Sequence, residues 1–386
     1  MKLGRGNQME ELLQRICSEI QISTNQHEQA ETSYKAVAKW LSDDVERFQD
    51  VEIDIYSQGS LRIGTTVQPI RKQEFDLDLV CELHLDWEHY DNPVEVLDMI
   101  EDRLNENETY KPMVERKNRC IRLNYKRNFH MDILPACPVV EDDKGCVKVP
   151  DRKKREWKDS NPKGYANWFE RIAEDYEPLI LTELFEKSAK IEPLPDVEQV
   201  ELKPPLKRAI QLIKRHRDIY FKESLEQAPI SIVLTTLAAS LYNREGSVNE
   251  AITAILEGIS NLSAKGKKIV VRNPMNELEI LSERWDTEPK LYKIFVQFIK
   301  DFQRDWAHVN ELKELGLPEV AAKLKEMFGD EPINKSFVKQ ASFNEALRNK
   351  GILGITTAGV VSAAPLTAVA KEEITRMPRN TFYGYK

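Results

Sequence analysis

The residues best suited to chemistry in this sequence are two aspartates that follow a Gly–Ser pair. Gly59 and Ser60 come directly after the alternating segment 51–58, and Asp76 and Asp78 follow in the string EFDLDLV. Side chains two positions apart on a strand project from one face, so both carboxylates would stand together. Asp-x-Asp alone is common on solvated strand edges, and the preceding Gly–Ser turn favours a catalytic role.

A third acid, Asp132, lies in the apolar string FHMDILPA. Its apolar neighbours Met131 and Ile133 predict that Asp132 occupies the polar face of a buried strand. Three carboxylates on adjacent strands repel one another, and magnesium relieves this repulsion because it prefers carboxylate oxygens together with substrate phosphates. We therefore predict that Asp76, Asp78 and Asp132 bind two Mg²⁺ ions, with Mn²⁺ as a substitute, and that they support attack by a hydroxyl with loss of pyrophosphate.

The Gly–Ser pair has the properties of a phosphate-binding turn. Gly59 lets the backbone approach a ligand closely, and the string SLRIG predicts a helix start whose free N–H groups face a phosphate. The Ser60 hydroxyl adds a donor. Arg62, in the same short helix, is a weaker candidate, with a surface arginine as the alternative.

The elements that would position these residues follow from the spacing of apolar side chains. Strands are predicted over 51–58, 76–83, 119–125 and 129–136. Helices are predicted over 8–50 with a break at 23–25, and over 93–106, 163–188, 205–222, 229–244, 247–263, 287–307, 311–327 and 335–348. This order is typical of an α+β fold in which a mixed sheet packs against a helical lobe.

Composition excludes several classes of protein. The chain is 41% hydrophobic and 31% charged, which is typical of a globular protein and not of a disordered one. A net charge of −8 argues against strong binding to duplex nucleic acid. The five cysteines form no CxxC pair, the six histidines form no HExxH, and no secretory signal is visible, so we expect reduced thiols, a cytoplasmic location and no structural zinc.

The string GS…DLD…D resembles the catalytic signature of the polymerase-β-like nucleotidyltransferases. The surrounding strings resemble the bacterial cGAS/DncV-like nucleotidyltransferases over roughly residues 30–310; they are QGSLRIGTTVQPI, EFDLDLV, MDILPA, SNPKGYANWF, IQLIKRHRD, PISIVLTTLA and NPMN…RW. This resemblance implies a Mg²⁺-dependent enzyme that makes a cyclic di- or trinucleotide second messenger from ATP, with GTP as a further candidate substrate, in anti-phage (CBASS) signalling. The overall look of the sequence favours the branch that makes trinucleotides.

The resemblance also implies a division of the chain and a substrate-binding helix. The expected parts are N-terminal helices spanning the lobes (1–50), a catalytic core (51–160), a helical lobe completing the nucleotide cleft (161–348) and a C-terminal tail (349–386). In the family, a lysine and a serine on successive helices contact the donor triphosphate, and Lys214 and Ser231 match those positions. From the residues alone, the basic run 203–217, which includes Lys207, equally fits a solvated helix face.

Other basic and aromatic segments leave alternatives open. The run 152–158 is predicted to be a solvated loop, with contact to triphosphates or to an activating partner as the alternative. The basic segment 111–127 is expected only to offset the negative charge of the acidic strands. Tyr165, Trp168 and Phe169 have helical spacing, which favours core packing over base stacking.

Two other functions remain as alternatives to cyclic-nucleotide synthesis. A template-independent transferase acting on RNA 3′ ends would need a broad basic surface, which the acidic composition disfavours. A non-catalytic scaffold is disfavoured because all three acids are present. We expect the protein alone to be a monomer.

The sequence of the C-terminal tail predicts a binding site for a partner protein. Residues 351–370 carry no charge and have transmembrane length, but they contain Pro365 and many small residues, so an irregular or partly packed tail is favoured and no membrane is expected. The terminal aromatic residues Phe382, Tyr383 and Tyr385 are typical of a partner anchor. The family resemblance implies a conjugating enzyme that acts on the C-terminus, although here Gly384 is not terminal.

Overall fold

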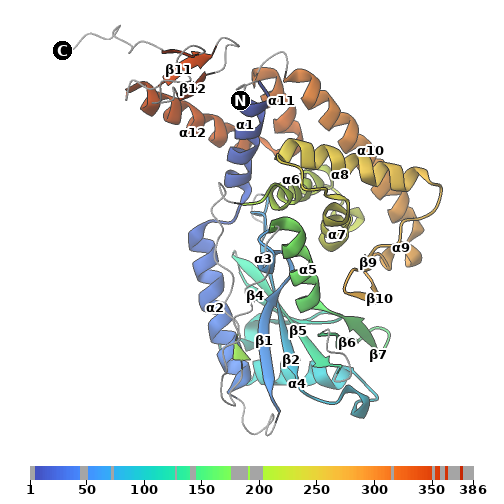
Figure 1. The fold of residues 1–386 in the computed structure, drawn as a ribbon. Coiled ribbons are helices and arrows are strands. Elements are labelled where there is room, and N and C mark those ends of the chain that lie inside the picture. The colour runs from blue at the N-terminus through green and yellow to red at the C-terminus, as the bar shows by residue number, and fades with distance from the viewer. Residues whose placement is uncertain are drawn as a thin grey trace.

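A computed structural model places two lobes one above the other, with a cleft between them (Figure 1). It describes residues 5–43, 51–70, 74–126, 128–139, 145–174, 190–191, 203–313, 317–349, 353–356, 361–363 and 374–376. The predicted α+β class is confirmed.

The sheet lobe is built on a twisted mixed sheet of eight described strands, in the order β3-β4-β5-β2-β1-β8, with β6 bridging β5 and β7. The strands are β1 (Ile53–Gln58), β2 (Phe75–Leu83), β3 (Val114–Arg116), β4 (Ile121–Tyr125), β5 (Phe129–Pro138), β6 (Val147–Asp151), β7 (Glu156–Ser160) and β8 (Lys190–Ile191). Strands β2 and β5 are parallel neighbours, which requires a long crossover, and α4 (Val94–Asn105) lies within it. The predicted strands are therefore confirmed, and β6 and β7 were not predicted.

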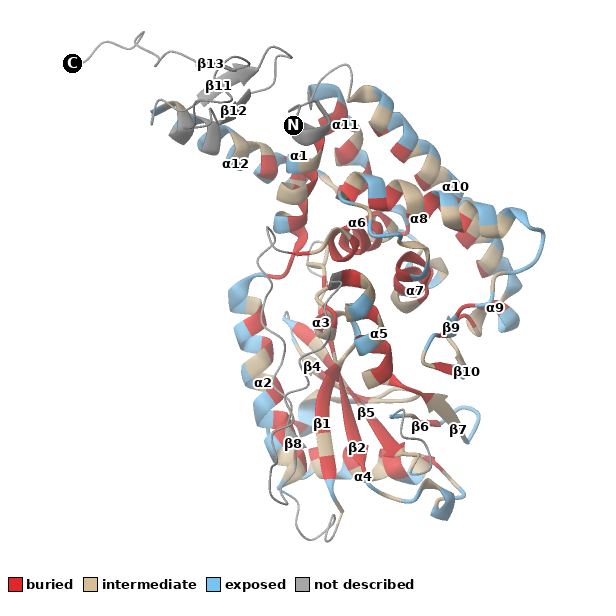
Figure 2. Cartoon of the chain, in the orientation of Figure 1, coloured by how far each residue is buried: buried red, intermediate tan, exposed pale blue. Residues whose placement is uncertain are grey.

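Both faces of this sheet are covered, although unequally. One face packs against α2 (Thr24–Ser42) and α4 and forms the larger apolar cluster, which includes Tyr34, Leu79 and Ile133. The other face has a small cluster that includes Tyr56 and Val80. Because Tyr56 is buried there, β1 is buried on both faces (Figure 2), which corrects the half-buried strand predicted from its alternation.

The helical lobe has a continuous apolar core. Its helices are α1 (Arg5–Ile20), α5 (Pro162–Glu174), α6 (Pro205–Tyr220), α7 (Ser231–Leu241), α8 (Val248–Ala264), α9 (Arg284–Thr287), α10 (Pro289–Leu312), α11 (Leu317–Phe328) and α12 (Asp330–Asn349). A short hairpin, β9 (Arg272–Asn273) and β10 (Asn276–Ile280), projects toward β7. Helix α1 packs in this core while α2 packs on the sheet, so the N-terminal helices contact both lobes.

Most predicted helices are confirmed, with shifted ends. The break at 23–25 coincides with the N-cap of α2, where Ser23 and Gln26 form a capping box. Residues 175–188 of the predicted helix 163–188, the segment 44–50 and most of the Pro-rich segment 192–206 lie outside the described residues. Single-turn 3-10 helices cover Trp87–His89, Lys111–Met113 and Leu225–Gln227.

The prediction of an irregular tail was wrong in part. An antiparallel sheet of β11 (Leu353–Thr356), β12 (Val361–Ala363) and β13 (Ile374–Arg376) follows α12. These short strands contain the Ile, Val and Thr residues that favour extended backbone. Among the described helices, none combines the length and apolarity needed to cross a membrane. The terminal aromatic residues lie outside the described residues.

Candidate active site

The three predicted acids meet at one position in the sheet. The parallel register of β2 and β5 places Asp78 directly beside Asp132, and Asp76 lies two residues earlier on the same face of β2. Asp76 is 56% exposed, whereas Asp132 is only 16% exposed. The spacing predicted from the sequence therefore produces one carboxylate cluster.

Arg122 on β4 neutralises part of this cluster. It lies opposite Asp132 in the antiparallel β4–β5 register. Its Nε and Nη2 donate to the two Asp132 carboxylate oxygens at 2.6 and 2.7 Å, and Nη2 also reaches Asp76 at 3.3 Å. Sequence reasoning did not single out Arg122, although it lies in the basic segment predicted to offset the acidic strands.

Arg122 and Lys214 only partly offset the negative charge around Asp78. Burial raises the pKa of Asp78 to about 7, and the nearby charges of Asp76 and Asp132 add to this increase. A bound cation would stabilise the ionised form of Asp78, because its positive charge offsets the repulsion among the three carboxylates. The all-carboxylate donor set and the unrelieved repulsion therefore fit a hard divalent ion such as Mg²⁺.

Gly59 is required by the closeness of the backbone to Asp78. Its φ is +66°, and a Cβ added there would lie 2.3 Å from Asp78 Oδ2. Both the left-handed backbone and the contact exclude a side chain. Gly59 begins the short helix α3 (Gly59–Arg62), so the turn after β1 passes directly against the acids.

The loop that follows α3 is held by the helical lobe. Ser60 Oγ lies 3.1 Å from Thr66 Oγ1, and the Ser60 carbonyl accepts from the N–H of Thr65. From α6, Lys214 Nζ donates to the carbonyl and hydroxyl oxygens of Thr65 at 3.2 and 3.0 Å, and Gln211 donates to the carbonyl of Thr66 at 2.8 Å. Lys214 therefore orients the Gly–Ser turn as well as facing the cleft.

The basic run on α6 is not a solvated face. Lys207 is 1% exposed and Lys214 is 6% exposed. Lys207 forms an ion pair with Glu170 of α5 at 2.8 Å and does not belong to the pocket, whereas Lys214 does. Burial, followed by the charge of Arg217, lowers the pKa of Lys214 to about 7. An anion bound in the pocket would stabilise the charged form of this buried lysine.

Arg217 is a second pocket cation that sequence reasoning missed. It follows Lys214 by three residues and so lies on the same helix face. Its Nη1 donates to Ser231 Oγ at 2.7 Å, at the first residue of α7. This contact connects the two predicted triphosphate positions, Lys214 and Ser231. The i+3 spacing was the signal that could have identified Arg217.

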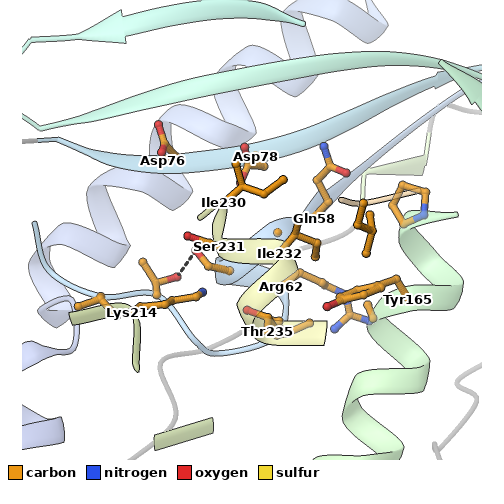
Figure 3. A pocket seen from close by; sticks show the side chains of 18 of the residues that line it. Gln58, Arg62, Asp76, Asp78, Tyr165, Lys214, Ile230, Ser231, Ile232 and Thr235 are labelled. Atoms are coloured by element: carbon orange, nitrogen blue, oxygen red, sulfur yellow. Dashed lines mark hydrogen bonds between the residues drawn. The ribbon is translucent and has the colours of Figure 1, made fainter. Parts of the chain in front are cut away.

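One pocket of about 660 Å³ joins these groups. Figure 3 shows Asp76 and Asp78 on their strand, and Ser231, Thr235 and Lys214 entering from the helical lobe. Ile230, Ile232 and Leu281 form an apolar wall. The predicted residues Gly59, Ser60, Arg62, Asp76, Asp78, Lys214 and Ser231 all line the pocket, and Asp132 lies beside it in the pair with Arg122.

The aromatic residues of α5 are divided between the core and the pocket. Phe169 is fully buried, and Trp168 packs against the same cluster, as predicted. Tyr165 is also in this cluster, but it lines the pocket, and its hydroxyl is paired with Thr236 at 2.9 Å. The core-packing prediction is therefore confirmed for all three residues.

A group of hydrogen bonds, which we call the asparagine clasp, closes one end of the pocket. It consists of Ser160, Asn161, Asn273, Asn276 and Glu279. The Glu279 carboxylate accepts from Ser160 Oγ at 3.0 Å, from Asn161 N at 3.3 Å and from Asn273 Nδ2 at 2.7 Å. Asn276 Nδ2 donates to the Ser160 carbonyl at 3.3 Å. The clasp joins β7 of the sheet lobe to the β9–β10 hairpin of the helical lobe.

A second acidic group lies on β1 and β2, apart from the pocket. Asp54, Glu82 and His84 have ligand atoms within 4.8 Å of one another. Lys163 already lies 3.9 Å from Asp54 and 3.5 Å from Glu82, and its Nζ is over the Tyr56 ring. The ammonium group therefore already supplies the positive charge, and we do not assign the catalytic metal to this group.

Comparison with known proteins identifies the family. Residues 8–172 match the model of the Second Messenger Oligonucleotide or Dinucleotide Synthetase domain. The chain is 39% identical over 380 residues to a c-di-GMP synthase of Roseivirga ehrenbergii, a match that covers 98% of this chain and 97% of that protein. The chain belongs to the cGAS/DncV-like nucleotidyltransferase family. The resemblance seen in the sequence is confirmed.

More distant relatives agree with this membership. The nucleotidyltransferase is 25% identical over 360 residues to the cyclic dinucleotide synthase CdnG of Bradyrhizobium diazoefficiens, a match covering 88% of this chain and 84% of that protein. The solved structure of that CdnG, in complex with GTP, has the same fold. Its TM-score is 0.66 at 21% identity, covering 85% of this chain and 97% of that chain.

Two lysines on α6 of this nucleotidyltransferase provide a matched test. Lys214→Ala should weaken nucleoside triphosphate binding by about 1.5–3 kcal/mol, because it removes a charge-assisted contact in the pocket. Lys207→Ala should leave the KM unchanged and lower the Tm, because it removes the buried ion pair with Glu170. Steady-state kinetics and thermal melts of both variants separate these effects. Equal changes in KM would contradict the assignment of Lys214.

Proposed function

We propose that this nucleotidyltransferase joins two nucleoside triphosphates into a cyclic dinucleotide second messenger for anti-phage signalling. The main support is the pairing of opposite charges across one cleft. Asp76 and Asp78 face the pocket from the sheet lobe, and Lys214 and Arg217 line it from the helical lobe. Nucleotidyl transfer needs a carboxylate cation site beside a cationic triphosphate site, and this pocket contains both.

We propose that Asp76, Asp78 and Asp132 hold Mg²⁺. When bound, the metal neutralises the phosphates, favours the ionised form of the attacking hydroxyl and stabilises the leaving pyrophosphate. The protein supplies the orientation. Arg122 donates to both Asp132 oxygens and so fixes this carboxylate beside Asp78.

The donor triphosphate is assigned to the opposite wall. The Gly59–Ser60 turn would donate backbone and hydroxyl hydrogens to it, and Lys214, Arg217 and Ser231 would fix its outer phosphates. Arg62 lines the same pocket and makes no ion pair with the described residues, which favours a phosphate contact over its alternative as a surface arginine.

Relatives favour a dinucleotide product that contains guanine. The relative that is 39% identical is named as a c-di-GMP synthase, and the CdnG relative is named as a cyclic dinucleotide synthase. We therefore replace the expected trinucleotide with a dinucleotide, and we place GTP before ATP as the substrate to test. An RNA 3′-end transferase and a non-catalytic scaffold have no comparable support.

One incubation distinguishes these functions. The protein is mixed with GTP, ATP and MgCl₂, then treated with nuclease and phosphatase, and the products are resolved by mass spectrometry. We expect a small product that resists phosphatase because its phosphates are bridging. An extended labelled RNA in a parallel reaction would support the RNA transferase instead, and no turnover with any substrate would support the scaffold.

The tail is proposed as a docking element for a conjugating or activating protein. Its described strand β13 pairs with β11, so the part that can be removed without breaking this sheet is 377–386. Deleting 377–386 should leave the rate of cyclic-nucleotide synthesis near wild type, because α12 and β11 lie away from the cleft (Figure 1). The same deletion should abolish capture of the partner in a pull-down. A truncated protein unable to make product would show that these residues belong to the catalytic fold.

A further inference from the structure

A turn at the edge of the sheet lobe carries four consecutive cations. Residues Arg152, Lys153, Lys154 and Arg155 connect β6 to β7, and all four are exposed. Lys154 is shared between Glu156 at 3.9 Å and Glu283 at 3.7 Å. Arg152, Lys153 and Arg155 form no ion pair with any described residue. Three uncompensated cations on a chain of net charge −8 indicate an external anion.

Hydrogen bonds hold the backbone of this turn in place. The N–H of Arg152 donates to the Asn118 carbonyl at 3.1 Å, and the N–H of Lys153 donates to Asn118 Oδ1 at 2.9 Å. The N–H of Lys154 donates to Asp151, which is 1% exposed. Such an anchored turn differs from a mobile basic loop because its backbone need not be ordered when an anion binds.

The turn lies beside the wall of the active-site pocket. Arg119 lines that pocket and pairs with both Asp151, the last residue of β6, and Glu283, another pocket residue. Arg119 precedes Arg122 by only three residues, so at most about 10 Å of chain separates it from the residue that grips Asp132. The turn therefore lies next to the pocket wall, where Lys154 also reaches the pocket residue Glu283.

The chemistry of the proposed function requires a second polyphosphate site. In the first transfer, a ribose hydroxyl oxygen of the acceptor bonds to the α-phosphorus of the donor, the hydroxyl proton is lost and pyrophosphate leaves. The acceptor keeps its own triphosphate, which is attacked only in the second, ring-closing transfer. During the first transfer, Lys214 and Arg217 are assigned to the donor, so the acceptor triphosphate needs other cations.

Resting on that proposed function, we propose that the turn 152–155 binds the triphosphate of the acceptor nucleotide during the first transfer. The assignment predicts a step-specific effect. In ring closure the same triphosphate becomes the donor and moves to Lys214, so the turn then contributes nothing. A general electrostatic attraction of nucleotides would instead act on both steps.

The test uses the full chain and two variants with equal change in charge. The first variant carries Arg152→Gln, Lys153→Gln and Arg155→Gln. The control carries Lys290→Gln, Lys293→Gln and Lys300→Gln, which are exposed on α10 and form no ion pair with described residues. We expect the first variant to lose about tenfold in kcat/KM for the first transfer from GTP. It should close a supplied linear pppGpG, and use guanosine as an acceptor, at wild-type rates.

Two results would overturn the proposal. One is an unchanged first transfer, and the other is an equal loss in ring closure or with guanosine. A binding measurement keeps the result independent of turnover: calorimetric titration with α,β-methylene-GTP and MgCl₂ should show two sites in wild type and in the control. The second site should be about tenfold weaker in the turn variant. If wild type makes no cyclic product but the turn variant still binds the second nucleotide more weakly, the proposed function fails and the anion site stands. If both affinities are unchanged in the turn variant, the site is excluded.

Discussion

Replacing both Asp76 and Asp78 with Asn should lower cyclic-nucleotide synthesis by about 10³-fold or more while the metal-free protein becomes more stable. The loss follows because the cation site loses charged ligands. The gain follows from burial and the neighbouring acids, which raise the pKa of Asp78 to about 7 from an ordinary 3.8. The folded protein therefore binds a proton that the unfolded chain releases, so stability falls as the pH rises from about 4 to 7.

The size of this effect can be measured directly. A shift from 3.8 to about 7 corresponds to up to about 4 kcal/mol of lost stability at neutral pH without metal. Urea unfolding in EDTA should show about 3 kcal/mol of this loss between pH 5 and pH 8 in wild type, because part of it already occurs below pH 5, and little of it in Asp78→Asn. The exposed Asp102→Asn on α4 serves as the control and should behave as wild type. A large drop in the Tm of Asp78→Asn would show that this acid stabilises the fold.

Gly59→Ala should be nearly as damaging to synthesis as loss of the acids. The new Cβ would lie 2.3 Å from Asp78 Oδ2, so either the turn or the carboxylate must move, and a 1 Å displacement at such a site costs about 10²-fold in rate. The left-handed backbone adds about 1–2 kcal/mol of strain. Activity and Tm of the purified variant measure the two effects separately.

Gly266→Ala is the matched control for this substitution. Gly266 has a φ of +73°, close to that of Gly59, but nothing lies within 4 Å of its added Cβ. It should therefore show the same loss in Tm with normal synthesis. Normal synthesis in Gly59→Ala would mean that the close approach of the turn to Asp78 is not needed.

Local patterns in the sequence were sufficient to predict the acids and the elements that carry them. Alternation and apolar runs define β1, β2 and β5, and the side-chain period of two places Asp76 and Asp78 on one face. Asp132 was found because a lone acid in an apolar strand is unusual. The Gly–Ser turn was predictable because glycine lets the backbone approach another group closely, as Gly59 does at Asp78.

Residues whose role depends on register or on tertiary contacts could not be predicted. Arg122 acts because it lies opposite Asp132 in the β4–β5 register, and no local pattern shows this. Lys207 and Lys214 are both lysines of α6, but Lys207 pairs with Glu170 of α5 whereas Lys214 lines the pocket, and only tertiary contacts distinguish them. The hairpins β6–β7 and β9–β10 were missed because their strands are only two to five residues long, too short for a period to be recognised.

The asparagine clasp has a consequence for how the product leaves. Its contacts are hydrogen bonds between polar groups, and each can be exchanged for bonds to water at a net cost of about 1 kcal/mol. On the helical side of the cleft, Tyr165 and Phe169 belong to the continuous apolar core, where separation would expose buried surface at a far higher cost. The pocket should therefore open for product release at Asn161 and Asn273, and the apolar core around α5 should stay closed.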